Sequence, residues 1–134
     1  TRLSSTGSTS PKTRTGPSSH HEERVTDTRV VLMTVPDLHT AEAVVGNLVV
    51  ARLAACASIL PGVTSLYWWE GEVQRSSEVL VVMKTSAECV DALISRAAEL
   101  HPYDVPELLA LPVENGLSAY LAWVGRECRV AEEE

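Results

Sequence analysis

The chain has 134 residues and a mass of 14.5 kDa, with 45% hydrophobic and 22% charged residues, which indicates one globular domain. The net charge of −7 would repel a phosphate backbone and excludes nucleic acid as an expected partner. Its longest apolar runs, such as residues 79–83, are far shorter than the roughly 20 residues that cross a bilayer, so we expect no membrane partner. Three cysteines without a Cys-x-x-Cys pair form no disulfide framework and suit a reducing cytoplasm.

The first 28 residues differ in composition from the rest of the chain. They hold thirteen Ser or Thr residues, two Pro, two Gly and almost no apolar side chains. Such a segment cannot bury enough apolar surface to offset the entropy of folding. His20 and His21 lie in it, and we interpret them as solvated. The sequence predicts a disordered tail over residues 1–28 and a folded domain over residues 29–134.

The folded part alternates between strand and helix patterns of apolar residues. Asp37 or Thr40 is the candidate cap of the first helix, and Thr85 and Glu88 have the spacing of a capping box for the second. The expected elements are a strand over 30–35, a helix over 41–52, a strand over 54–69 interrupted at Pro61 and Gly62, a strand over 72–84, a helix over 90–100, a strand over 108–113 and a short helix after Gly116.

This order of elements is the split βαβ arrangement, an α+β fold with a four-stranded antiparallel sheet and both helices on one face. The first and third strands are apolar on both sides, so the second face of the sheet needs a cover. Trp68 and Trp69 point to opposite faces of the long hairpin between the second and third strands. We therefore expect a homo-oligomer built on the sheet. The alternative is that the short C-terminal helix alone covers the open face.

Four segments resemble the signature blocks of the CutA, or divalent-cation tolerance, family. The likeness extends from about Val30 to Arg126. It implies a ferredoxin-like βαββαβ sandwich with a long hairpin and a short C-terminal helix, assembled as a homotrimer, and a response to copper and other metal ions. The segments are RLAACASILP at 52–61, GVTSLYWWEG at 62–71, HPYDVPE at 101–107 and YLAWV at 120–124.

The resemblance also implies a metal site. Family members proposed to hold copper have a Cys in the first strand and a His pair before the Pro-Tyr element. Here Met33 and Leu100 replace two of those ligands, and His101 is kept. Cys56, in the second strand, is a further candidate ligand, although a thiol on an apolar strand is usually core. A site of His101, Met33 and Cys56 would favour Cu(I) over Cu(II), because thioethers prefer the softer ion.

A second candidate site would bind a small anion or a metal–ligand complex in a cleft between subunits. A simpler interpretation is that Lys84 emerges into solvent at a strand end and that His101 caps the preceding helix. The candidate residues are Lys84, Tyr103, Glu107, Tyr67, Trp69 and Trp123.

Three functions agree with these features. The favoured one is a trimeric, non-catalytic protein that binds a monovalent or divalent metal ion or a small ligand. The second is a trimeric scaffold that recruits other proteins. The third is an uncharacterised enzyme that uses His101, Glu107 and Lys84, although the sequence has no Gly-rich phosphate loop, nucleophile elbow or His-x-x-x-His spacing. Copper is the one cofactor that the resemblance suggests.

Overall fold

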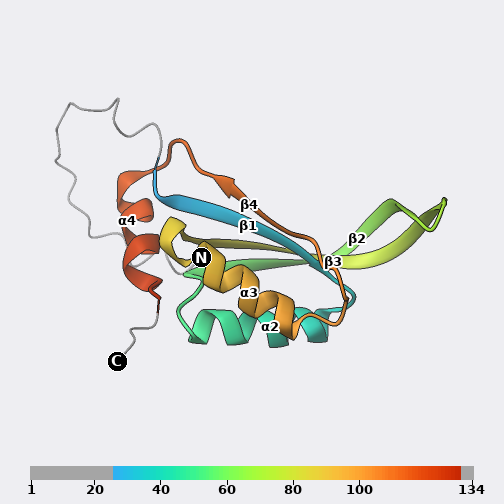
Figure 1. Ribbon diagram of the computed structural model, residues 1–134. Helices are drawn as coiled ribbons and strands as arrows, with labels where there is room; N and C mark the ends of the chain where they lie inside the picture. Colours follow the sequence, from blue (N-terminus) through green and yellow to red (C-terminus); the bar gives the residue numbers. More distant parts are fainter. Residues whose placement is uncertain (1–25, 131–134) are drawn as a thin grey trace.

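Four antiparallel strands form a single sheet in the computed structural model, which describes residues 26–130 (Figure 1). The sheet order is β2-β3-β1-β4, and helices α2 and α3 lie on one face of it, as the split βαβ arrangement predicts (Figure 1). Helix α4 lies at one end of the sheet (Figure 1). The elements are β1 (Thr28–Val35), α2 (Leu38–Val50), β2 (Cys56–Trp69), β3 (Glu72–Ser86), the 3-10 helix η2 (Ala87–Cys89), α3 (Val90–Leu100), β4 (Leu108–Pro112) and α4 (Ser118–Glu127).

The ordered domain begins earlier than the sequence predicts. Residues 1–25 of the expected tail lie outside the described residues, but residues 26–28 belong to the fold. Thr28 begins β1, and the hydroxyl of Thr26 donates to the carbonyl of Val113 at 2.7 Å. Because this bond ties the chain to the segment after β4, the domain boundary lies at or before Thr26.

The core lies between the sheet and the two helices. Alternate residues of β1 and β3 face the helices, as expected for a pleated strand, and Val31, Met33 and Val35 pair in register with Met83, Val81 and Val79. All six are buried. The helices contribute Ala41, Val44, Val45, Leu48, Leu93 and Ala97 to the same cluster.

One predicted helix cap is confirmed and the other is wrong. The carboxylate of Asp37 accepts a hydrogen bond from the Thr40 amide at 2.8 Å, which also lowers the pKa of Asp37. Thr85 does not form a capping box, because β3 continues through Ser86 and η2 precedes α3. The fully buried Thr85 hydroxyl instead donates to the carbonyl of Leu53 at 2.7 Å.

The hairpin of β2 and β3 extends well beyond the helices (Figure 1). β2 continues through Pro61 and Gly62, where a bulge between Leu60 and Val63 shifts the register. Glu70 and Gly71 turn the chain with φ values of 51° and 80°, as a tight hairpin turn requires. The large apolar side chains of this arm that are more than half exposed are Leu66, Trp68, Trp69 and Val73.

The second face of the sheet is only partly covered. Leu60, Leu109 and Leu111 lie on this face according to the strand register, and they are 43%, 54% and 45% exposed. Within one protomer, the alternative in which α4 alone covers the open face is therefore wrong. Among the described helices, none has both the length and the apolar character that crossing a membrane requires.

Candidate ligand site at the root of the hairpin

His101 links the end of α3 to the end of β1. Its Nε2–H donates to the carbonyl of Thr34 at 2.8 Å, and its Nδ1 accepts the Tyr103 amide at 3.1 Å. The carbonyl can only accept, so the tautomer carries its proton on Nε2. The side chain is buried, and the following Pro102 favours the extended backbone seen at His101. Both ring nitrogens are therefore engaged in holding the loop.

Tyr103 and the buried Glu78 form a hydrogen-bonded polar pair at this position. The Tyr103 phenol donates to Oε2 of Glu78 at 2.9 Å, and Glu78 is only 8% exposed. Burial, followed by the hydrogen bond and the charge of Glu78, raises the pKa of Tyr103 to about 12. The Tyr103 ring also lies against His101, with centroids 4.8 Å apart.

The arm contributes to the same position. The hydroxyls of Tyr67 in β2 and Ser76 in β3 are hydrogen-bonded at 3.1 Å. Tyr67 and Asp37 lie near enough to Tyr103 for each to add to the rise in its pKa. We call the five residues where the arm leaves the sheet the hairpin-root cluster: Tyr67, Ser76, Glu78, His101 and Tyr103.

Glu78 was missed by the sequence analysis. The sequence does hold one indication of its role: Glu78 stands directly before the apolar run 79–83 of a strand. A carboxylate next to a buried strand segment is expected only if it has a hydrogen-bond partner. With the nearby Asp37, Glu78 makes the hairpin-root cluster negative. A site of phenols, a hydroxyl and a carboxylate fits a small cation better than an anion.

Lys84 lies at the opposite end of the sheet. It pairs in register with Val30 and Cys56, six residues along β3 from Glu78, or about 20 Å. The Cys56 thiol is hydrogen-bonded to the Tyr120 phenol at 3.5 Å. Burial and this contact raise the pKa of Tyr120 to about 12.

The predicted ligand residues are therefore divided within one protomer. Tyr67 and Tyr103 lie together in the hairpin-root cluster. Trp123 stacks on Tyr120 of α4, with centroids 5.7 Å apart, at the end where Lys84 lies. Trp69 is at the tip of the arm, and Glu107 is exposed just before β4. The three residues of the enzyme alternative, His101, Glu107 and Lys84, are likewise not brought together in one protomer.

The predicted metal ligands do not converge either. Met33 is fully buried on the helix side of the sheet, opposite Val81. Cys56 pairs with Lys84, so its side chain lies on the other face. His101 already uses both ring nitrogens. Among residues 26–130, no three His, Cys, Asp or Glu side chains lie close enough to hold a metal ion. One protomer thus does not fit a copper ion at these residues.

Comparison with known proteins places these features in one family. The family model described as CutA1 divalent ion tolerance protein matches residues 29–127. The divalent-cation tolerance protein CutA of Pectobacterium atrosepticum is 44% identical over 103 residues, covering 77% of this chain and 94% of that protein. Protein CutA 1, chloroplastic, of rice is 42% identical over 100 residues, and the chain spans only 56% of its length.

Solved structures agree with this assignment. The crystal structure of CutA from Xylella fastidiosa has a TM-score of 0.75 and 42% identity, covering 77% of this chain and 99% of that one. CutA1 from Oryza sativa has a TM-score of 0.76 and 39% identity, covering 81% and 99%. The chain therefore belongs to the CutA1 divalent ion tolerance family.

Proposed function

We propose that this chain acts as a homotrimer in the tolerance of divalent metal ions, and that it binds metal as a complex with a small ligand rather than catalysing a reaction. The assembly is proposed because one protomer leaves a large apolar surface exposed on the open sheet face and on the arm. Trp68 is 73% exposed and Trp69 is 60% exposed, and aromatic side chains of this size dominate subunit interfaces. Three subunits rather than two are chosen on the family resemblance.

The hairpin-root cluster is the proposed ligand site. Glu78 and Asp37 supply negative charge, while the phenols of Tyr67 and Tyr103 offer hydrogen bonds and ring faces. A cationic metal complex fits this set better than a bare ion, because a bare ion needs several convergent donors. Copper is the metal that the resemblance suggests. A cytoplasmic location belongs to the same proposal, since the three cysteines are free thiols.

Two measurements on the full chain test this function. Multi-angle light scattering should give three times the protomer mass of 14.5 kDa, and a monomer mass would contradict the assembly. Calorimetric titration with a one-to-one Cu(II)–histidine complex should show binding that free histidine does not.

Substitutions locate the binding. Glu78→Gln should weaken uptake of the complex severalfold, whereas Glu107→Gln, which removes an exposed carboxylate from the neighbouring loop, should not. Equal loss in both variants would contradict a site at the hairpin root. A trimer that takes up no complex would favour the scaffold alternative.

A further inference from the structure

A second buried cluster lies apart from the main core, beneath α4. It consists of Cys89, Val124 and Cys128, with Ala55, Tyr120 and Trp123 packed around it. Cys89 ends η2 and is fully buried, and Cys128 follows the last residue of α4 and is 5% exposed. Two thiols that lie 39 positions apart in the sequence therefore belong to one small apolar cluster between the C-terminal helix and the start of α3.

The two thiols are neighbours. Both belong to the same buried cluster, and burial, together with the neighbouring Cys128, raises the pKa of Cys89. The Cys128 thiol itself donates to the carbonyl of Val124 at 3.0 Å and lies 3.6 Å from the Thr85 hydroxyl. Neither thiol serves the hairpin-root cluster or the main core.

Cys56 is not part of this pair, although its thiol is hydrogen-bonded to Tyr120 at the edge of the cluster. It pairs with Lys84, so its side chain lies on the opposite face from that of Thr85, the next residue of β3. Because Thr85 contacts Cys128, the third thiol lies on the other side of the strand. Any internal disulfide is therefore expected between Cys89 and Cys128 alone.

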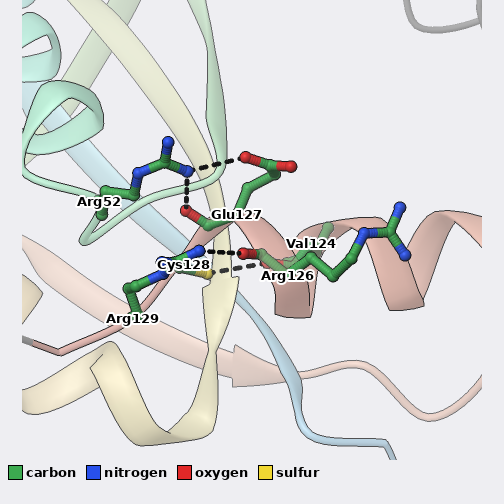
Figure 2. Close-up of polar contacts among 6 residues, drawn as sticks. All are labelled: Arg52, Val124, Arg126, Glu127, Cys128 and Arg129. Atoms are coloured by element: carbon green, nitrogen blue, oxygen red, sulfur yellow. Dashed lines mark hydrogen bonds and ion pairs between the residues drawn. The ribbon is translucent and has the colours of Figure 1, made fainter.

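Exposed contacts between Arg52 and Glu127 lie at the end of α4 directly before Cys128, as Figure 2 shows. The Arg52 guanidinium donates to the carboxylate of Glu127 at 2.8 Å and to its carbonyl at 3.2 Å. The Arg129 amide donates to the Arg52 carbonyl at 2.9 Å. We call Arg52, Glu127 and Arg129 the C-terminal latch. Contacts of this exposed kind open at low free energy, and their opening would uncover Cys128 before Cys89.

We propose that Cys89 and Cys128 are a redox-modification site, which hydrogen peroxide converts to an intramolecular disulfide that joins α4 to the start of α3. The Cys128 thiolate attacks one oxygen of the peroxide; an S–O bond forms, the O–O bond breaks and water leaves after proton transfer. The Cys89 thiolate then attacks the sulfenic sulfur, forming the S–S bond and releasing a second water. Two thiols are oxidised and one peroxide is reduced, so atoms and electrons balance.

The test uses the reduced full-length protein in the presence of EDTA. After exposure to hydrogen peroxide and alkylation under denaturing conditions, Cys56 should carry the alkyl group, and a peptide containing Cys89 should be joined to one containing Cys128. The mass before alkylation should fall by about 2 Da, two hydrogens. The melting temperature of the oxidised protein should rise and return on reduction. A Cys56→Ser variant should behave in the same way.

A disulfide that includes Cys56, a disulfide between chains, or a Cys128 sulfinic acid beside a free Cys89 would each overturn the proposal. So would three intact thiols after peroxide treatment.

A matched pair of variants tests the latch. Glu127→Gln removes the ion pair with Arg52 and should speed disulfide formation by about twofold to fivefold, the range expected for an exposed ion pair. Glu99→Gln removes a second exposed ion pair of the described residues, with Arg96, and should leave the rate unchanged. Equal rates in all three proteins would show that the latch does not control access.

Discussion

Tyr103 donates a hydrogen bond at 2.9 Å to Glu78, a carboxylate that is only 8% exposed. The pair joins the α3–β4 loop to β3 at the point where the arm leaves the sheet. Because a buried carboxylate needs donors, the bond fixes the position of the loop relative to the arm, and the proposed ligand site depends on that position.

Removing the phenol should destabilise the protein. Tyr103→Phe should lower the free energy of unfolding by about 1–2 kcal/mol. This is the contribution of a hydrogen bond to a charged group, reduced because the ring is partly exposed to solvent. Urea denaturation measures this loss. Tyr67→Phe, which removes an exposed phenol from the same cluster, is the control and should change stability little. Equal effects of the two variants would contradict the importance of the Glu78 contact.

The same contact predicts a dependence on alkaline pH. The pKa of Tyr103 rises from its ordinary value of 10.0 to about 12 in the folded protein. Its contribution to stability is thus complete below pH 10 and is lost as the pH rises through about 12, because the unfolded chain releases the proton first. Tyr120 adds a similar loss. Melting temperatures of the wild type should fall more steeply over this range than those of Tyr103→Phe, and identical slopes would contradict the assignment.

Thr85 should be necessary for the stability of the buried end of β3. Thr85→Val keeps the shape of the side chain but removes the donor to the Leu53 carbonyl, and should cost about 1–2 kcal/mol. Thr64→Val on the exposed arm is the matched control, with little change expected. Chemical denaturation distinguishes the two, and a neutral Thr85→Val would show that Leu53 finds another donor.

The arm tryptophans should matter for assembly. Replacing Trp68 and Trp69 by Ala should raise the concentration at which the oligomer dissociates by at least about tenfold, because large interface aromatics each contribute several kcal/mol. Light scattering on a dilution series measures the change. Val50→Ala, at an exposed position of α2, should leave assembly intact. An unaltered oligomer in the double variant would place the interface elsewhere.

His101 should act as a structural clamp rather than a copper ligand. In a full-length background with His20→Ala and His21→Ala, His101→Gln should lower the melting temperature, since it breaks the bonds to Thr34 and Tyr103. Its affinity for free Cu(II), without a small ligand, should stay unchanged in calorimetry, as should that of Met33→Leu. If the wild type bound one copper per chain tightly and His101→Gln abolished that binding, His101 would be a copper ligand after all.

The order of elements was predictable because strand and helix periods are local patterns. The failures come from contacts between distant residues. Thr85 has the spacing of a helix cap, but the Leu53 carbonyl takes its hydroxyl. His101 is the C-cap residue of α3, as predicted, but its ring also bonds to the carbonyl of Thr34, 67 residues away, which no local pattern indicates.

The candidate site was less predictable than the fold. Tyr67 and Tyr103 were expected at one site and lie together, whereas Lys84 and Trp123 lie at the other end of the sheet. The distance between these two groups of residues follows from the strand register of β3. Sequence position alone does not show how far a strand extends past its neighbours. Glu78 was overlooked since a single carboxylate beside an apolar run has no motif of its own.

Both edge strands of the sheet contain a proline: Pro61 at the bulge of β2 and Pro112 at the end of β4. Each proline lacks the N–H that a newly added strand would need, and the bulge also disturbs the straight edge. An added strand would therefore meet an interrupted hydrogen-bonding edge at Pro61 and at Pro112. In a protomer with so much exposed apolar surface, these irregular edges disfavour open-ended growth of the sheet, while the arm and the open face stay available for closed assembly.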